Sequence, residues 1–215
     1  YLKILQNLHR YPPEAPFDPK KTALLTIDLQ YLDAHPDGWM GRLCRDQGRP
    51  DHLKERFDFI QEILPNVRRL QDTCRANGIE VIHIRVAYRT RDGRDGRRGL
   101  SANLAMSPIV PSDDDFLEEV APVGDEIVID KTSAGTFNST SIDQLLRNMG
   151  INRLWVTGIV TEGCVEMTAR DAADRGFLVT LVSDGCASST HVAHNDALQR
   201  MGDGRHRGEE LDRLV

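Results

Sequence analysis

The chain has 215 residues, of which 40% are hydrophobic, and this is enough to bury the core of one domain. Its 27 Lys and Arg residues are outnumbered by 33 Asp and Glu, so the net charge is -6 and the overall positive charge that binds a nucleic acid backbone is lacking. The apolar runs fall far short of the ~20 residues that a membrane-spanning helix needs. Four cysteines without a CxxC pair indicate reduced thiols. We therefore expect a soluble, cytoplasmic protein that binds neither nucleic acid nor membranes.

Short apolar segments alternate with helical patterns along the chain. The predicted strands are residues 22–28, 80–86, 126–130, 153–158 and 177–183. The predicted helices are residues 53–77, 139–149 and 163–175, and each is followed by a glycine that favours a helix C-cap. Because nearly all-apolar strands are typical of a sheet covered on both faces, this order predicts an α/β fold. We expect a doubly wound three-layer sandwich with a mostly parallel sheet, forming a single domain over residues 1–215.

Three segments fall outside this alternation. Residues 1–21 carry four prolines and are predicted to form an extended N-terminal arm. Residues 87–120 are rich in Arg, Asp, Gly and Pro and are too long for an ordinary connection, so they are predicted to cover the site or to form an interface. Residues 202–215 are polar and are predicted to be a partly mobile tail. A subunit contact through such segments would suit a homodimer or a homotetramer.

Three chemically active side chains stand at the ends of predicted strands. Asp28 ends the first strand, Lys131 follows the third, and Cys164 follows the fourth at the start of the next helix. In an open parallel sheet these carboxyl ends share one edge, so we expect the three groups to converge. An adjacent ammonium and a helix N-terminus lower the pKa of a thiol, and a carboxylate can take the thiol proton and return it to a leaving nitrogen. The pattern predicts nucleophilic catalysis on a small-molecule substrate.

Segments around these residues carry a resemblance to a known family. They are DLQ from Asp28, TSAGTFNSTSIDQLLRNMGI after Lys131, and GIVTEGCVEMTARDAADRGF around Cys164. Together they resemble the signatures of the isochorismatase-like cysteine hydrolases, which include nicotinamidases, N-carbamoylsarcosine amidase, and the ureidoacrylate and biuret hydrolases. The resemblance covers roughly residues 20–201. It implies a catalytic triad of Asp28, Lys131 and Cys164, and an amidase-type hydrolase of carbon-nitrogen bonds.

The resemblance also implies a mechanism. A cis peptide bond between Ile159 and Val160 would turn the Val160 N–H toward the site, and with the Cys164 N–H it would form an oxyanion hole. Asp28 would deprotonate Cys164, and the thiolate would attack an amide, carbamoyl or ureido carbonyl to give a thioester. Two alternatives stay open: an isochorismatase-type ether hydrolase, whose chemistry needs no thiol, and a non-catalytic binding protein of the same fold.

The remaining histidines and cysteines favour structural roles. Nicotinamidases of this family carry an Asp-x-His metal motif after the second strand, where this chain has VAYRTRDGRDGRR, so we expect no metal and no cofactor. His191 and His194 have a spacing that can bind a metal, but a capping or surface role is expected because no third ligand is evident. His83 is predicted to be a core histidine with a hydrogen-bonded ring. Cys44, Cys74 and Cys186 are predicted to be unreactive.

Substrate contacts are predicted from two features. Gln30 lies two residues beyond Asp28, and it either contacts the site or packs beside it. Six arginines stand between residues 85 and 98 in an otherwise acidic protein, and the segment leaves the carboxyl end of the second strand. Because the guanidinium fork suits a carboxylate, we expect Arg85, Arg89 or Arg91 to bind an anionic substrate. The alternative is that this charged loop is a solvated face or a subunit contact.

Overall fold

The computed structural model describes residues 16–90, 92–96 and 109–202. Most of the predicted N-terminal arm, the centre of the 87–120 segment with Arg91, and the predicted tail from residue 203 lie outside the described residues. In the described ranges, no helix combines the length and the apolar character needed to cross a membrane.

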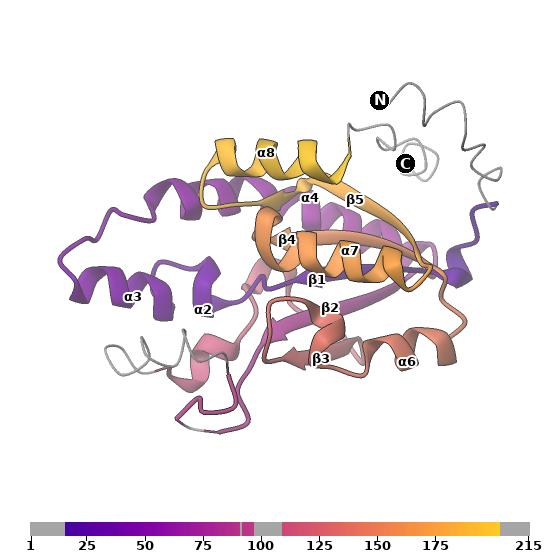
Figure 1. Cartoon of the computed structure of the whole chain (residues 1–215), viewed down its shortest axis with the longest axis horizontal. Coiled ribbons are helices and arrows are strands. Elements are labelled where there is room, and N and C mark those ends of the chain that lie inside the picture. Colours follow the sequence, from indigo (N-terminus) through magenta and orange to yellow (C-terminus); the bar gives the residue numbers. More distant parts are fainter. Residues whose placement is uncertain (1–15, 91, 97–108, 203–215) are drawn as a thin grey trace.

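A five-stranded parallel sheet forms the centre of the molecule, as the sequence predicted. Its strand order is β3-β2-β1-β4-β5, so the chain starts in the middle and winds outward in both directions. The strands are β1 (Thr22–Ile27), β2 (Glu80–Val86), β3 (Ile127–Lys131), β4 (Arg153–Ile159) and β5 (Leu178–Ala187). Their carboxyl ends all point to the side where α2 lies (Figure 1). This topology brings the ends of β1, β3 and β4 to one edge.

Helices cover both faces of the sheet, which confirms the three-layer α/β fold. The helices are α2 (Tyr31–Ala34), α3 (Trp39–Asp46), α4 (Lys54–Ala76), α6 (Ile142–Asn148), α7 (Glu166–Asp174) and α8 (His191–Met201). The long helix α4 packs on one face through Ile60, Leu64 and Val67. The sequence patterns did not predict α2 and α3, because both are short and have no side-chain cap.

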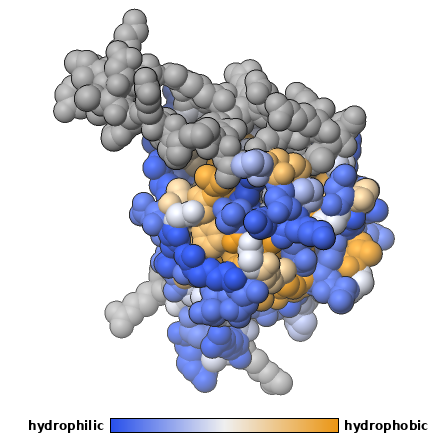
Figure 2. All heavy atoms as spheres, turned by 90° about the vertical axis from the view of Figure 1, so that its right-hand side faces the viewer, coloured by the Kyte–Doolittle hydropathy of each residue, from blue (hydrophilic) through white to orange (hydrophobic). Residues whose placement is uncertain are grey.

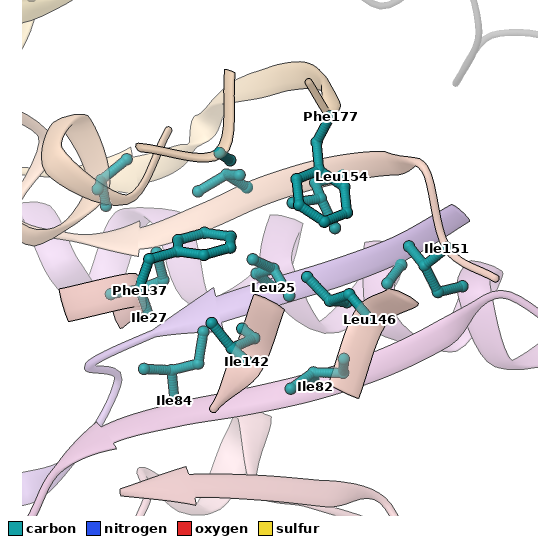
Figure 3. Packing of buried hydrophobic residues seen from close by; sticks show 14 of the residues in the cluster. Leu25, Ile27, Ile82, Ile84, Phe137, Ile142, Leu146, Ile151, Leu154 and Phe177 are labelled. Carbon is teal, nitrogen blue, oxygen red and sulfur yellow. The ribbon is translucent and has the colours of Figure 1, made fainter. Parts of the chain in front are cut away.

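The core on the other face lies between the sheet and α6 and α7 (Figure 3). Leu25 and Ile27 of β1 meet Ile142 and Leu146 of α6, and all four are fully buried. Strands β1 and β4 are buried along their whole length, because each has a strand neighbour on both sides. Strand β3 departs from the expected burial: it is an edge strand whose residues alternate between partly buried and exposed, with Val128 40% exposed.

Element boundaries differ from the sequence prediction near the site. Lys131 is the last residue of β3 and does not follow the strand. Cys164 lies in a π-helical turn, Thr161–Val165, that precedes α7, because Gly163 has non-helical backbone angles and interrupts the helix. Strand β5 extends to Ala187 and pairs with β4 through a shift of register after Val156. After this shift, Gly158 and Ile159 of β4 pair with Cys186 and Ala187 of β5.

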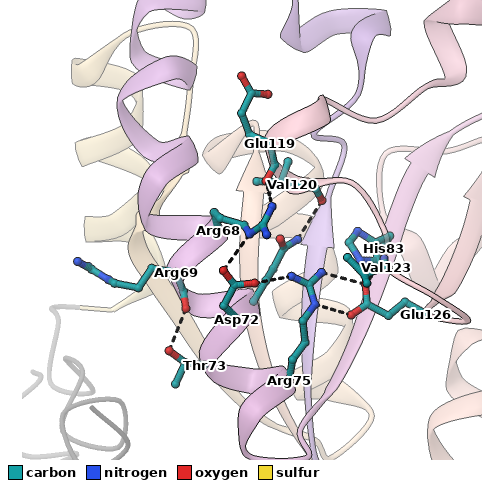
Figure 4. Close-up of polar contacts among 11 residues, drawn as sticks. Arg68, Arg69, Asp72, Thr73, Arg75, His83, Glu119, Val120, Val123 and Glu126 are labelled. Atoms are coloured by element: carbon teal, nitrogen blue, oxygen red, sulfur yellow. Dashed lines mark hydrogen bonds and ion pairs between the residues drawn. The ribbon is translucent and has the colours of Figure 1, made fainter.

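A polar network ties β2 and β3 to α4 on the side away from this turn (Figure 4). The buried ring of His83 bonds Thr26 Oγ1 at 3.1 Å and Glu126 Oε2 at 2.9 Å, which confirms the predicted core histidine. Arg75 of α4 donates to both oxygens of Glu126, at 2.8 and 3.0 Å. At the amino ends of the strands, hydrophilic and apolar residues are interspersed on the surface (Figure 2). The network thus holds α4 against the sheet, and it lies apart from the carboxyl edge where the site is found.

Candidate active site

Asp28 is held in a specific backbone conformation at the end of β1. Its φ of 55° lies in the left-handed region, and its N–H donates to the Ile84 carbonyl of β2 at 2.8 Å. The neighbouring strand approaches closely here, since a Cβ on Gly158 would lie 2.0 Å from the Ile27 carbonyl oxygen. Only glycine therefore fits at this position of β4. The carboxylate of Asp28 is buried, with 2% of the side chain exposed.

Lys131 joins the other two members of the predicted triad. Its fully buried ammonium lies 2.8 Å from Asp28 Oδ2 and 3.5 Å from Cys164 Sγ, and it donates to the Ser133 carbonyl at 3.1 Å. These three contacts use the three protons of the ammonium, so its position is determined. The loop behind it is fastened to α7, because Thr168 Oγ1 lies 3.0 Å from Thr136 Oγ1. The structure therefore brings Asp28, Lys131 and Cys164 together at one edge of the sheet.

The turn that carries Cys164 is fixed by its own backbone and by β5. The Ile159–Val160 peptide bond is cis, at the position that the resemblance implied. The N–H groups of Gly163 and Val165 both donate to the Val160 carbonyl, at 2.9 and 3.3 Å. Cys164 is the one free cysteine that is partly exposed in the described part of the chain. Cys164 is therefore a partly exposed cysteine in a turn whose backbone is held by these hydrogen bonds.

A buried histidine anchors the same turn from α8. Thr161 Oγ1 donates to the Ala187 carbonyl at 3.1 Å and lies 2.8 Å from His194 Nδ1. With the hydroxyl proton directed to Ala187, the hydroxyl oxygen accepts from a protonated Nδ1 of His194, so the ring is hydrogen-bonded to the turn. The expected surface or capping role of His194 is therefore wrong, since the ring is buried against Phe59 and bonds the nucleophile turn.

The protonation of the thiol differs from the sequence expectation. Burial raises the pKa of the Cys164 thiol, and the charge of Asp28 adds to the increase, which outweighs the lowering effect of Lys131. Cys164 also does not begin α7 as expected, because it lies in the turn Thr161–Val165 that precedes the helix. Burial also raises the pKa of Asp28, although Lys131 opposes this effect. Cys164 is therefore a protonated thiol at neutral pH, and it would need a base in order to act as a nucleophile.

One oxygen of Asp28 is available for that proton. Oδ2 is bound by Lys131, whereas Oδ1 is buried without a well-formed hydrogen bond in the described residues. The thiol of Cys164 is close enough to interact with this carboxylate, which lowers the pKa of Asp28 and raises that of Cys164. Asp28 therefore lies beside the thiol with one carboxylate oxygen that has no partner in the described residues.

The residues predicted to contact substrate lie in different surroundings. Gln30 is fully buried, and its amide bonds the N–H and the carbonyl of Val86 and the carbonyl of Asp113. Arg85 donates to Asp130 Oδ1 and to the Asp114 carbonyl, both at 2.7 Å, and lies over the Phe116 ring. Arg89 is exposed, and Arg91 lies outside the described residues. Gln30 and Arg85 therefore hold the end of the 87–120 segment against the sheet.

Sequence reasoning missed two charged residues beside the triad. Asp33 of α2 and Arg56 of α4 form an ion pair at 3.0 Å, and the charge of Asp33 acts on both Lys131 and Cys164. The charge of Arg56 in turn lowers the pKa of Asp28. The available signal was the position of Asp33, which lies five residues beyond Asp28 at the same edge of the sheet. Arg56 had no such signal, because it reaches the site through the packing of α4.

No second nucleophile or metal site accompanies the triad in the described residues. Burial raises the pKa of Cys74 and of Cys186 to about 12, which agrees with the predicted lack of reactivity. His191 is half exposed and stacks on Phe59, with Glu55 and Glu62 within ion-pair distance. Within residues 16–90, 92–96 and 109–202, no group of three metal-binding side chains comes together.

Comparison with known proteins agrees with this geometry. A family model described as the isochorismatase domain matches residues 22–210. The chain belongs to the isochorismatase domain family. N-carbamoylsarcosine amidase from Arthrobacter sp. is 33% identical over 123 residues, which are 55% of this chain but only 47% of that protein. Ureidoacrylate amidohydrolase RutB from Serratia proteamaculans is 29% identical over 89% of this chain and 78% of its own length.

Solved structures show the same isochorismatase fold. A cysteine hydrolase from Pseudomonas syringae pv. phaseolicola superposes with a TM-score of 0.73 at 24% identity, covering 90% of this chain and 91% of the other. An isochorismatase family protein from Desulfovibrio vulgaris gives a TM-score of 0.71 at 24% identity, covering 84% and 89%. The fold class and the family predicted from the sequence are thereby confirmed.

Proposed function

We propose that this isochorismatase-family protein is a cysteine amidohydrolase that cleaves a carbon-nitrogen bond of a small amide, carbamoyl or ureido compound. The observation that carries the proposal is the position of Lys131, whose ammonium contacts both Asp28 and the Cys164 sulfur. The names of the amidase relatives support the same reaction class. Ether hydrolysis is disfavoured, because it gives no reason for a thiol to contact a buried ammonium.

The reaction begins with transfer of the thiol proton to Asp28. As Cys164 Sγ attacks the substrate carbonyl, its proton passes to Asp28 Oδ1, while Lys131 keeps Oδ2 in place. The N–H groups of Val160 and Cys164 are proposed to stabilise the negative charge on the carbonyl oxygen, a role in which one donor is worth about 100- to 1000-fold in rate. Asp28 then returns the proton to the leaving nitrogen, and the carbon-nitrogen bond breaks to leave a thioester.

Water completes the cycle. Asp28 accepts a proton from the attacking water, the thioester carbonyl receives the hydroxide, and the bond between carbon and Cys164 Sγ breaks with return of the proton to sulfur. The products are a carboxylic or carbamic acid and an amine or ammonia. No step of this cycle uses a metal, and we expect activity to survive prolonged dialysis against EDTA.

A panel of primary amides, carbamoyl amino acids and ureides, scored by release of ammonia or amine, tests the proposal. We expect turnover of at least one of these classes by the wild-type chain and none by Cys164→Ala. Mass spectrometry of quenched reactions should detect the acyl group on Cys164. Turnover that survives in Cys164→Ala, or that is lost with EDTA and restored by zinc, iron or manganese, would contradict the proposal, and the absence of hydrolysis across the panel would favour a binding protein of this fold.

A further inference from the structure

The nucleophile turn, Thr161–Val165, is held by side chains as well as by its own backbone. Thr161 is fully buried, and its hydroxyl donates to the last carbonyl of β5 at 3.1 Å and accepts from His194 Nδ1 at 2.8 Å. The next residue of the turn, Glu162, accepts a hydrogen bond from the buried Ser188. Two consecutive residues of the turn are thus bonded to α8 and to the segment before it, and none of these partners takes part in the proposed cycle.

His194 is itself held in place near the start of α8. Thr190 caps this helix, since its side chain accepts from the Ala193 N–H at 3.1 Å, and its carbonyl accepts from the His194 N–H at 3.1 Å. The His194 ring is buried and meets Phe59 of α4 edge-on, with the ring centroids 5.3 Å apart. A close-packed ring next to a capped helix end keeps one rotamer. Nδ1 therefore has a defined position opposite Thr161.

Helix α8 also contacts the chain on the other side of the nucleophile. Arg200, near the end of α8, donates to the mostly buried Glu166 at 2.9 Å, and Glu166 is the first residue of α7. His194 and Arg200 are six residues apart, which is about 9 Å along a helix axis. One helix is therefore bonded to Thr161, three residues before Cys164, and to Glu166, two residues after it. Because the Arg200 side chain is half exposed, the buried bond of His194 is the stronger constraint.

The proposed cycle depends on where this turn places the Cys164 sulfur. Sγ lies 3.5 Å from Lys131 Nζ and interacts with Asp28, and a displacement of about 1 Å of a reacting group can cost about 100-fold in rate. The backbone bonds within the turn fix its shape but not its orientation toward Lys131. Val165 packs in the apolar core, and apolar contacts have no preferred direction. The directed hydrogen bonds of Thr161 therefore set the orientation of the turn.

We propose that His194 is a positioning residue, which holds the nucleophile turn through Thr161 and keeps the Cys164 sulfur in place, an inference that rests on the proposed function. His194 takes no proton in the cycle and acts through one buried hydrogen bond. Two titratable groups act on it, His191 on the same helix and Glu162 in the turn. Burial lowers the pKa of His194, with His191 adding to this effect and Glu162 opposing it, so the ring is neutral and donates from Nδ1 above neutral pH.

His194→Leu and His194→Asn form a matched pair, because the two side chains are similar in size and only the Asn amide can donate in place of Nδ1. In His194→Leu the thiol should leave the surroundings that raise its pKa. Alkylation of Cys164 by iodoacetamide at about pH 8.5, the ordinary pKa of a free thiol, should then become at least about 10-fold faster. On a substrate found in the panel, kcat should fall by about 10- to 100-fold with KM within about 3-fold of wild type. His194→Asn should stay within about 3-fold of wild type in alkylation and in kcat.

His191→Leu is the control from the same helix. His191 stacks on the same Phe59 ring, but in the described part of the chain its ring pairs with Glu55 and Glu62 of α4 and makes no bond to the turn. Its replacement should leave both the alkylation rate and kcat unchanged. Peptide mapping assigns the labelled cysteine in every variant.

Thermal unfolding verifies that each variant is folded at the assay temperature. Thr161→Val removes the hydroxyl with little change of shape, so it takes the place of His194→Leu if that variant is unfolded, and the same changes are expected. The inference is overturned if alkylation in the folded variant stays within about 3-fold of wild type, or if His194→Asn behaves like His194→Leu. A rise in KM with kcat unchanged also overturns it, because the residue would then act in substrate binding. If the wild-type chain hydrolyses no compound of the panel, the proposed function fails, and the alkylation rates still decide whether His194 positions the thiol.

Discussion

Lys131 Nζ lies 2.8 Å from Asp28 Oδ2 and 3.5 Å from Cys164 Sγ. One buried ammonium therefore acts on the pKa of both the carboxyl group and the thiol. The negative charge of Asp28 raises the pKa of the Cys164 thiol, and the positive charge of Lys131 lowers it. The two residues therefore act on the thiol in opposite directions, although both are required for the proposed cycle.

Replacement of Asp28 is expected to separate thiol reactivity from turnover. In Asp28→Asn the thiol loses the anion that raises its pKa, so alkylation of Cys164 by iodoacetamide at pH 7.5 (chosen as ~1 unit below the ~8.5 of a free thiol) should become faster. Turnover should fall by about 100- to 10,000-fold, because the general base is gone. Lys131→Met should slow alkylation as well as turnover. Peptide mapping assigns the labelled residue.

Slower alkylation in Asp28→Asn would contradict this account of the thiol. Cys164→Ala provides the background, since Cys74 and Cys186 are buried with a pKa of about 12 and Cys44 is also buried. If iodoacetamide labelled one of those three cysteines before Cys164, Cys164 would not be the reactive thiol.

Arg85 and Arg89 are expected to respond differently to replacement. Arg85→Ala should lower the melting temperature without raising KM, because the side chain is engaged by Asp130, the Asp114 carbonyl and the Phe116 ring. Arg89 is exposed and stays the described candidate for a substrate carboxylate. Arg89→Ala should raise KM for N-carbamoylglycine by about 10-fold and leave biuret, which has no carboxylate, unaffected. Equal effects on both substrates would assign the loop a structural role.

Gln30 is expected to act on stability and not on chemistry. Gln30→Leu leaves the N–H and the carbonyl of Val86 and the carbonyl of Asp113 without their side-chain partner. The free energy of unfolding should fall by about 2 to 4 kcal/mol, as expected for losing buried hydrogen bonds. Urea denaturation measures the loss, and kcat/KM at a temperature where the variant is folded should stay within about 3-fold of wild type. A large fall in kcat/KM with unchanged stability would favour a direct role in the site.

Glu126 is expected to make the fold sensitive to acid. Burial acts to raise its pKa, but Arg75, the Val123 N–H and His83 lower the pKa to about 2, below its ordinary value of 4.5. A carboxylate with a depressed pKa stabilises the fold fully above pH 4.5 and loses this contribution as the pH falls from 4.5 toward 2. Its contribution at neutral pH is about 3 kcal/mol, since one pKa unit corresponds to about 1.4 kcal/mol.

Urea denaturation between neutral pH and pH 3 (roughly midway in the titration range of a carboxyl group) tests this. Glu126→Gln should be less stable than wild type at neutral pH and should lose less on acidification. Asp72→Asn is the control from the same network, because its exposed ion pairs with Arg68 and Arg75 contribute little. Identical pH profiles for wild type and Glu126→Gln would show that this carboxylate does not govern acid stability.

The sequence by itself determined the fold class and predicted which three residues the structure brings together at the candidate site. Runs of apolar residues indicate strands that are buried on both faces of a sheet, and glycines after helical patterns indicate where helices end. The strands and the α/β order could therefore be predicted from local patterns. Asp28, Lys131 and Cys164 could be placed together because parallel strands share a carboxyl edge. The short helices α2 and α3 escaped prediction, since neither has a side-chain cap or a long apolar pattern.

Only the tertiary structure decided the charge states and the polar partners. The pKa of Cys164 depends on burial and on distances to residues far apart in the chain, so the expected lowering by Lys131 was reversed by desolvation and by Asp28. The same holds for the arginines: strand β2 supplies Arg85 to Asp130 of β3, whereas the guanidinium beside the triad comes from Arg56 on α4. Packing brought Arg56 to Asp33, because a helix reaches a sheet edge through its buried face, and no local pattern in the sequence records that contact.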